Sequence, residues 1–503
     1  MFIILVTEYL DNSAYNYPQK LAFASNDCTM TFAQLRAAAR CVAMSLIQKK
    51  IFRHPVAVFM EKSPKCIAAF LGTAYSGNFY TPLDTAMPTA RIKKIVELLN
   101  PSAIITDATH AETARSFAEK APVILYEEAQ KIVPDEKAID FVVEEITETD
   151  VLYVMFTSGS TGVPKGVVIS HRGVTSYMEW AKKAFGLNEK VILGNQTPFY
   201  FSMSVFDIYV TLSCGGTAYI IPKKLFSFPK YLLEFIRDNK INLIYWVPSA
   251  LCLVVNLKAI GHCNISCLDK VLFAGEVMPA RHLNIWRANI PKAMFANLFG
   301  PTEATDICNY YIINRQMTDN ETIPIGTIVP NMKMIILDEN DRPAQEGELC
   351  IGGSSLAYGY YNDPERTRAA FVQNPLNGYY PEYIYRTGDI VRYNSLGELV
   401  FVSRKDFQIK HMGHRIEMGE IEAAATSLNG VAQSCCIYDA EKRKIVLFYS
   451  GLPSTEEIID LLKTLLPNYM LPSKAVQLKG MPLNQNGKID RKAIKEQYER
   501  GNY

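Results

Sequence analysis

The stretch Val151-Leu-Tyr-Val-Met-Phe-Thr157-Ser158-Gly159-Ser160-Thr161-Gly162-Val163-Pro164-Lys165-Gly166 joins two different kinds of segment. Its apolar beginning, rich in β-branched and aromatic residues, predicts a buried strand. Its glycine-rich end predicts a loop whose backbone N–H groups converge on one anion, because glycine adopts backbone angles that other residues avoid. The Ser and Thr hydroxyls add donors, and Lys165 adds a positive charge. The stretch therefore predicts a polyphosphate-binding loop, although it lacks the Walker spacing G-x-x-x-x-G-K-[ST].

The composition is that of an ordinary globular protein. The chain has 503 residues, of which 49% are hydrophobic and 20% charged, and no apolar run approaches the ~20 residues of a membrane span. A net charge of +1 gives no reason to expect nucleic acid or an anionic membrane as a partner. The N-terminal run has no basic flank, which predicts that it is not a signal peptide. Eleven cysteines without framework spacing predict reduced thiols and a cytoplasmic protein.

Strands and helices alternate on both sides of the loop. Thr31 is a candidate N-cap for an amphipathic helix, and charged residues 127–150 are expected to form a solvated approach to the loop. The alternation predicts an α/β fold with mostly parallel sheets. Helices are expected at 31–49, 66–75, 91–99, 171–184 and within 197–214, and strands at 56–59, 77–83, 103–106, 241–247 and 271–274.

Further motifs follow the loop in a defined order. They are ANLFGPTEAT (296–305), GELCIGG (347–353), YRTGD (385–389), SRKDFQIK (403–410), LPNYMLP (466–472) and NGKIDR (486–491). Together with TSGSTGVPKG they resemble, in order and spacing, the signatures of the adenylate-forming superfamily, which includes acyl-CoA synthetases, luciferases and nonribosomal-peptide adenylation domains. In length and motif style the chain is similar to D-alanine–carrier-protein ligases. The resemblance implies a large N-terminal core of mixed and parallel sheets with helices, residues 1–402, and a small mobile α+β domain, residues 403–503.

The resemblance also implies a reaction. The family uses ATP and Mg²⁺ to convert a small carboxylic acid into an acyl-adenylate, and then passes the acyl group to a thiol. The C-terminal motifs resemble those of stand-alone peptide-synthetase-type enzymes, which implies a separate carrier protein with a phosphopantetheine arm as acceptor and a monomeric enzyme. A CoA ligase is the nearest alternative enzyme. A nucleotide-binding protein without turnover is disfavoured because Lys488, Glu303 and Asp389 are all present.

Individual roles follow from the same resemblance. Asp389, supported by Arg404, is expected to accept hydrogen bonds from the ribose hydroxyls, and Asp406 is the expected hinge. Phe299 is expected to stack on adenine, with Asn297 at its edge and Gly300 next to it. The expected catalytic residues are Lys488, Lys165 and Glu303, and Glu303 with Thr302 is expected to hold magnesium. The phosphate ligands are expected from Thr157, Ser158, Gly159, Ser160, Thr161, Gly162 and Lys165.

The acid is the least defined part of the prediction. In amino-acid-activating relatives, an Asp that pairs with the substrate ammonium stands at the position of Ser202. Asp207 lies about 140° further round a helix and is expected to be structural, whereas Phe206 shares the face of Ser202. The remaining lining expected by alignment is Met203, Tyr245, Leu272, Ala274, Leu298, Asp306 and Ile307.

Such a large, aromatic pocket favours an aryl acid without an α-amine. A hydroxybenzoate could place its hydroxyl against Asp306 or Tyr245. The alternatives are an amino acid, α or β, whose amine is held by Asp306, and a purely structural Asp306 that bonds a neighbouring backbone group.

Overall fold

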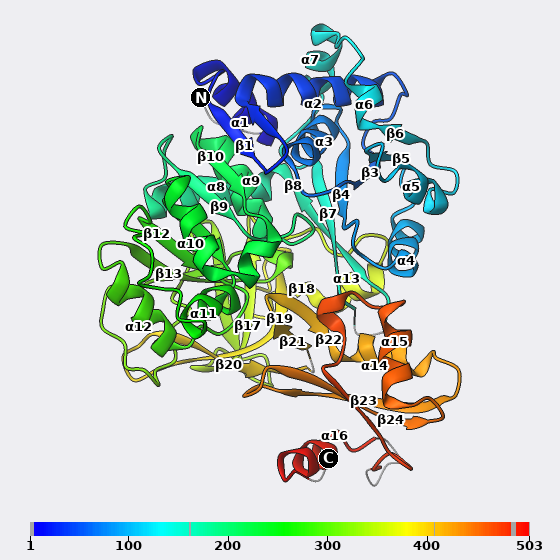
Figure 1. Cartoon of the computed structure of the whole chain (residues 1–503), viewed down its shortest axis with the longest axis vertical. Coiled ribbons are helices and arrows are strands. Elements are labelled where there is room, and N and C mark those ends of the chain that lie inside the picture. The colour runs from blue at the N-terminus through cyan, green and yellow to red at the C-terminus, as the bar shows by residue number, and fades with distance from the viewer. Residues whose placement is uncertain (1–4, 160–161, 407, 484–488, 502) are drawn as a thin grey trace. The chain divides into compact units, whose positions relative to one another are not determined.

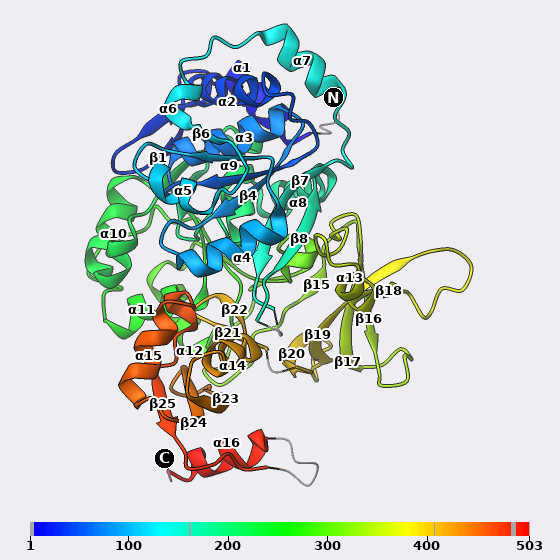
Figure 2. The same ribbon diagram turned by 90° about the vertical axis from the view of Figure 1, so that its right-hand side faces the viewer.

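The computed structural model describes residues 5–159, 162–406, 408–483, 489–501 and 503 (Figures 1 and 2). The chain divides into two compact units. The first contains Met1–Thr85, Leu99–Met155 and Gly166–Lys405, and the second contains Ala86–Leu98, Phe156–Lys165 and Asp406–Tyr503. The units therefore change at residues 405/406, whereas the sequence prediction puts the boundary at 402/403. The second unit also contains two segments from the N-terminal half, including the phosphate loop.

A six-stranded sheet contains the strand that leads into the phosphate loop. Its order is β6-β5-β3-β4-β7-β8, and the β3–β4, β3–β5, β5–β6 and β4–β7 pairs are parallel. The central strands are buried along their whole length, as expected for parallel strands covered on both faces. The strands are β3 (Pro55–Phe59), β4 (Phe79–Leu83), β5 (Ala103–Thr106), β6 (Val123–Leu125), β7 (Val151–Thr157) and β8 (Lys165–Ser170).

A nine-stranded sheet has the order β15-β14-β13-β12-β11-β9-β10-β1-β2, and its central pairs from β13 to β1 are parallel. Its strands are β1 (Leu21–Ala24), β2 (Thr29–Thr31), β9 (Ile192–Asn195), β10 (Thr217–Ile220), β11 (Leu243–Trp246), β12 (Lys270–Phe273), β13 (Met294–Phe299), β14 (Asn309–Ile312) and β15 (Thr327–Ile328). A third, antiparallel sheet contains β16 (Met332–Leu337), β17 (Glu346–Gly353), β18 (Phe371–Gln373), β19 (Tyr383–Tyr393) and β20 (Leu399–Arg404), which lie together in Figure 2.

Most of the helices between these strands pack apolar side chains into a single large core. Helices α8 and α9 run beside β9 and β10 (Figure 1). The helices are α1 (Val6–Asn16), α2 (Phe32–Ile47), α3 (Pro64–Tyr75), α4 (Thr89–Leu99), α5 (Ala111–Phe117), α6 (Tyr126–Ala129), α7 (Glu136–Glu144), α8 (His171–Phe185), α9 (Met203–Cys214), α10 (Pro229–Asp238), α11 (Pro248–Asn256), α12 (Ala280–Asn289) and α13 (Pro364–Ala370), with 3-10 turns η1 (Lys223–Ser227) and η2 (Thr302–Ala304).

The second unit has its own apolar core. Strand β23 (Val431–Asp439) pairs antiparallel with β24 (Lys444–Gly451), which pairs parallel with β25 (Lys474–Gln477). A hairpin of β21 (Gln408–His411) and β22 (His414–Glu417) precedes α14 (Met418–Thr426). The remaining elements are α15 (Thr455–Lys463), η3 (Asn468–Met470) and α16 (Arg491–Glu499).

Local signals in the sequence mostly agree with these elements. Thr31 caps α2 in a reciprocal capping box with Gln34, as its sequence position predicts. The charged segment 127–150, expected as a solvated approach to the loop, is mainly exposed or half-buried and contains most of α6 and all of α7. The Asp135 side chain caps α7, and Ile139 is buried. One buried residue per two turns is too sparse a pattern to distinguish this short helix from a loop. Among the described residues, no helix is both long and apolar enough to span a membrane.

Candidate active site

The phosphate loop begins where β7 ends, and its described residues make hydrogen bonds within the second unit. The Ser158 hydroxyl donates to the Arg415 carbonyl over 2.6 Å and accepts from the Glu417 N–H over 3.3 Å. The Gly159 N–H donates to a carboxylate oxygen of Glu420 over 3.2 Å. Gly162 has φ of +79°, a backbone conformation that glycine adopts without strain. Ser160 and Thr161 lie outside the described residues.

Glu420 connects this loop to a second segment of the chain. Its carboxylate also accepts from the Arg91 guanidinium at the start of α4, and both side chains of this ion pair are buried. Arg91 and Glu420 are absent from the sequence-based site prediction. No local pattern could reveal them, because they are 329 residues apart.

The turn after β13 presents Thr302 and Glu303. Glu303 is fully buried, and its carboxylate accepts from the Tyr360 hydroxyl over 2.8 Å. Gly300 is required by close packing, because an added Cβ would lie 2.4 Å from the Asp306 carbonyl oxygen. Among the described residues there is no group of three or more His, Cys, Asp or Glu side chains suited to a metal ion.

The two residues predicted to bind ribose are in direct contact. Arg404, at the end of β20, donates from Nη1 to Oδ1 of Asp389 on β19 over 2.7 Å. Its Nη2 donates to the Thr387 carbonyl over 3.0 Å, and the Asp389 N–H donates to the Thr387 hydroxyl. Antiparallel pairing of the strands sets Asp389 opposite Arg404. This arrangement fixes a buried carboxylate with lone pairs left for further donors.

The two residues predicted to bind adenine lie on β13. Asn297 donates its side-chain amide to the Pro324 carbonyl over 2.8 Å, and the buried Phe299 ring lies 6.1 Å from that of Phe401. These contacts fix both side chains, and the adenine-binding roles stay predictions. Lys488 lies outside the described residues, as does Phe407 next to Asp406.

The polar residues predicted to line the acid pocket gather around Asp306. Its Oδ1 accepts from the Ser202 hydroxyl over 3.2 Å, and its Oδ2 accepts from the Tyr245 hydroxyl over 3.0 Å. Oδ2 also accepts from the Tyr177 hydroxyl over 3.0 Å. Tyr177 lies on α8, far from the motifs in sequence, and it is absent from the sequence-based prediction. The bonding of Asp306 to hydroxyls differs from the expectation that a structural Asp306 would bond a backbone group.

Apolar side chains surround this cluster. The centroid of the Phe206 ring lies 4.9 Å from that of the Tyr245 ring and 6.2 Å from that of the Tyr177 ring. The other predicted lining residues are buried, namely Met203, Leu272, Ala274, Leu298 and Ile307.

Asp207 lies away from Ser202, as the helical geometry predicts. It accepts from the Asn195 side-chain amide. Burial raises the pKa of the Asp207 carboxyl to about 8, and burial also lowers the pKa of the neighbouring Lys62 ammonium to about 7. The Lys62 ammonium donates to the Gln196 carbonyl over 3.0 Å. Asp207, which lies on α9, therefore belongs to a buried polar group with Asn195 and Lys62.

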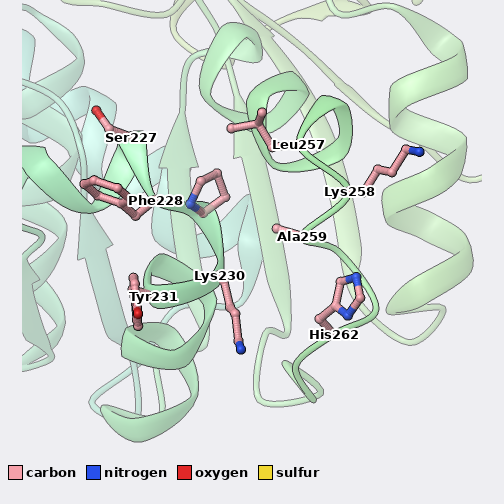
Figure 3. Close-up of a pocket in the computed structure, with 9 residues that line it drawn as sticks. Ser227, Phe228, Lys230, Tyr231, Leu257, Lys258, Ala259 and His262 are labelled. Atoms are coloured by element: carbon pink, nitrogen blue, oxygen red, sulfur yellow. The ribbon is translucent and has the colours of Figure 1, made fainter.

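A separate pocket of about 470 Å³ lies on the first unit (Figure 3). It contains none of the predicted site residues. Its lining is formed by residues 227–231 from η1 and α10, residues 257–259 and His262.

The comparisons with known proteins match nearly the whole chain. Residues 10–361 match the family described as AMP-binding enzyme, and residues 420–488 match the AMP-binding enzyme C-terminal domain. The D-alanine–D-alanyl carrier protein ligase of Bacillus velezensis is 32% identical over 95% of this chain and 97% of its own length. The L-proline–[L-prolyl-carrier protein] ligase of Streptomyces coelicolor is 31% identical, covering 95% of this chain and 94% of that protein.

Longer relatives match only in part. Tyrocidine synthase 3 of Brevibacillus parabrevis is 31% identical over 97% of this chain, but the chain spans only 8% of that protein. Among solved structures, the adenylation domain AlmE of Vibrio cholerae, in complex with glycyl-adenosine-5'-phosphate, has a TM-score of 0.85 at 22% identity and covers 99% of both chains. This likeness confirms the predicted α/β adenylation-domain fold. By its matches at both ends and by these full-length relatives, the chain belongs to the AMP-binding enzymes of the adenylate-forming superfamily.

Proposed function

We propose that this protein activates a small carboxylic acid with ATP and transfers it to the phosphopantetheine thiol of a separate carrier protein. In the first step a carboxylate oxygen attacks the α-phosphorus, the bond to the β-phosphate oxygen breaks, and pyrophosphate leaves. In the second step the thiol sulfur attacks the acyl carbon, loses its proton, and AMP leaves with the bonding electron pair. The main support is that two carrier-protein ligases match this chain over 95% of its length and over nearly all of their own.

Asp389 is our proposed ligand for the ribose hydroxyls. It is buried and already oriented by Arg404, so one carboxylate can receive two adjacent O–H donors without rearrangement. Phe299 and Asn297 are proposed to contact adenine. For the phosphates we propose the loop 157–162 with Lys165. Lys488 is the proposed cation between the attacking carboxylate and the α-phosphate, where it would neutralise developing charge.

Magnesium is the proposed metal, and the residues after β13 fit it. Carboxylate and hydroxyl oxygens are the ligands that Mg²⁺ prefers, and this ion is commonly held by one or two carboxylates plus substrate phosphates. Glu303 and Thr302 would hold it. When bound, the ion would neutralise phosphate charge. Glu303 is kept in place by the Tyr360 hydroxyl.

The two half-reactions are proposed to use two arrangements of a large domain, residues 1–402, and a small domain, residues 403–503. Asp406 is the proposed hinge. Its carboxylate accepts from the Gln408 N–H over 3.2 Å. Loop residues of this kind can absorb the backbone rotation of a domain movement.

Two classes of acid are candidates. An aryl acid such as a hydroxybenzoate would donate its hydroxyl proton to Asp306 and lie against the rings of Phe206 and Tyr245. An amino acid would give its ammonium to the same carboxylate. The names of the two full-length carrier-protein ligases support the second class, since D-alanine and L-proline are both amino acids.

The proposal is tested by acid-dependent exchange of pyrophosphate into ATP, followed by loading assays. We expect exchange with one class of acid, loss of exchange in Lys488→Ala with ATP binding retained, and normal exchange in the control Lys479→Ala, whose lysine is exposed. Loading of carrier proteins faster than CoA supports the carrier as acceptor, and the reverse preference would make the protein a CoA ligase. Full exchange activity in Lys488→Ala would remove Lys488 from the mechanism.

A further inference from the structure

Asp306 is a buried carboxylate held by side chains from three other segments. Tyr177 comes from α8, Ser202 from the residue before α9, and Tyr245 from β11. Each hydroxyl lies 3.0–3.2 Å from a carboxylate oxygen. Asp306 itself follows η2, so four separate parts of the first unit converge on one carboxyl group.

The direction of these hydrogen bonds is determined by chemistry. An ionised carboxylate can only accept, so Tyr245 and Ser202 donate their hydroxyl protons to Asp306, and Tyr177 shares its proton between Asp306 and the Tyr245 oxygen. Thr302 donates to the Ser202 oxygen over 3.3 Å and does not change this count. With these protons engaged, the three hydroxyls offer only lone pairs to any further group. The cluster as a whole is therefore a hydrogen-bond acceptor with a negative charge.

The backbone holds the carboxylate in a strained position. Thr305 and Asp306 have φ of +51° and +82°, and two successive non-glycine residues in this region cost free energy that the fold must offset. Thr305 is held by a hydrogen bond from its hydroxyl to the Ser355 carbonyl over 2.7 Å. Gly300 allows the backbone of residues 306–308 to pack closely against it. Strain of this kind accumulates where a side chain must be aimed at a ligand.

We propose that Asp306 binds the ammonium group of an amino-acid substrate, and that Tyr177 and Tyr245 position its carboxylate for this purpose. This inference rests on the proposed function and names its substrate class. Asp306 is the specificity-determining residue, because it provides the charge that a neutral Ser202 does not. Tyr177 and Tyr245 are positioning residues that act through Asp306.

An ammonium fits this cluster better than a phenolic hydroxyl. An ammonium brings up to three N–H donors and a positive charge to a site made of lone pairs and one negative charge. A phenol brings one donor and no charge. A buried carboxylate is stabilised more by a ligand of opposite charge than by a neutral one.

The titration behaviour of the tyrosines agrees with this geometry. Burial and the negative charge of Asp306 raise the pKa values of Tyr177 and Tyr245 well above the usual range. Both hydroxyls therefore keep their protons, and their orientation toward Asp306, across the pH range in which the enzyme would work.

The test compares acids that differ only in the amine. Pyrophosphate exchange is measured with alanine against lactate, β-alanine against 3-hydroxypropanoate, larger aromatic amino acids against their α-hydroxy analogues, and a set of hydroxybenzoates. We expect an amine-bearing acid to exceed its hydroxy analogue by about 100-fold or more in kcat/KM. Asp306→Asn should reduce that preference to about tenfold or less, and kcat/KM for the hydroxy analogue should change little.

The positioning residues have a matched control. Tyr177→Phe should raise KM for the amino acid by about tenfold, with kcat and KM for ATP nearly unchanged. Tyr209→Phe removes another buried tyrosine hydroxyl, one that contacts Tyr80 and not Asp306, and should leave KM unchanged. The pH profile of KM for the amino acid separates charge recognition from structural support. In wild type, KM should rise as the substrate ammonium loses its proton, and in Asp306→Asn this rise should be absent.

The possible failures are distinguishable. Exchange with hydroxybenzoates and not with amino acids would overturn this inference and leave the proposed function standing. Exchange with amino acids that survives unchanged in Asp306→Asn would also overturn it, because another group would then hold the ammonium. Absence of exchange with every acid of both classes would contradict the proposed function itself and this inference with it.

Discussion

Arg404 donates a hydrogen bond from Nη1 to Oδ1 of Asp389 over 2.7 Å, and both side chains are nearly inaccessible to solvent. A charge-assisted bond of this kind orients the carboxylate. If Asp389 receives the ribose hydroxyls, its orientation should determine the affinity for ATP. Substitution of Arg404 is therefore a direct test of the proposed nucleotide site.

We expect Arg404→Ala to raise KM for ATP by about 10- to 100-fold, since hydrogen bonds to charged groups contribute about 1.5–3 kcal/mol. KM for the acid should change much less. The measurement is pyrophosphate exchange at varied ATP concentration, and Arg392→Ala on the exposed side of β19 is the control. An unchanged KM for ATP in Arg404→Ala would contradict the assignment of Asp389 to ribose.

Gly300 gives a second prediction, because its lack of a side chain allows the backbone that carries Asp306 to pack closely against it. A Cβ at this position would lie 2.4 Å from the Asp306 carbonyl oxygen and 2.7 Å from the Cys308 nitrogen. Both are backbone atoms, so the chain itself must shift. We expect Gly300→Ala to lower kcat/KM for the acid by about tenfold or more, since misplacement by ~1 Å is sufficient for such losses.

The control for this prediction is Gly378→Ala, where an added Cβ meets nothing within 4 Å. It should be indistinguishable from wild type in the same exchange assay. Wild-type kinetics in Gly300→Ala would mean that the turn adapts without moving the proposed acid-binding residues.

The buried ion pair of Arg91 and Glu420 predicts a large effect on stability. Arg91→Met would leave the Glu420 carboxylate buried beside the phosphate loop without this partner, and breaking such a pair costs about 3–5 kcal/mol. The control is Arg36→Met, which breaks partly exposed pairs with Asp11 and Glu136 and should cost about 1 kcal/mol or less. Both values come from the shift of the unfolding transition in denaturant. A shift no larger than that of Arg36→Met would show that the pair contributes little.

His171 predicts how stability depends on pH. Burial lowers the pKa of its imidazole from 6.5 to about 4, an effect larger than the opposing influence of Asp150, and the Val6 N–H donates to Nδ1. The unfolded chain binds a proton below about pH 6.5, and the folded chain binds it only near pH 4. The contribution of His171 to the free energy of unfolding is therefore fully present above pH 6.5. It is lost between pH 6.5 and 4, and the total loss is on the order of 3 kcal/mol.

We expect His171→Gln to flatten the stability profile between pH 6.5 and 4, because glutamine can accept the same hydrogen bond without titrating. His262→Gln, at an exposed position, should leave the slope unchanged. The measurement is denaturant unfolding at several pH values. A slope that persists in His171→Gln would assign the effect to other groups.

The sequence defines the short-range features of this protein. Thr31 and Gln34 form the capping box at the start of α2, and the strand Val151–Thr157 runs into the glycine-rich loop, because both depend on residues that are neighbours along the chain. Helical geometry also separates Asp207 from Ser202. The family signatures can be read for the same reason, since each is a run of adjacent residues. The short helix α7 escapes prediction because it buries little on any face.

Only the tertiary structure brings the hydroxyls of Tyr177, Ser202 and Tyr245 to the Asp306 carboxylate. It likewise brings Arg91 and Glu420 together as an ion pair. The partners in these contacts are between 61 and 329 residues apart, so no local propensity or spacing relates them. Their meeting depends on how strands and helices pack around a common core, and on backbone angles such as that of Asp306, which that packing holds against strain. The sequence alone determined the family and the kind of chemistry. The packing decided how the Asp306 carboxylate is oriented, since a buried carboxylate takes its orientation from the groups around it.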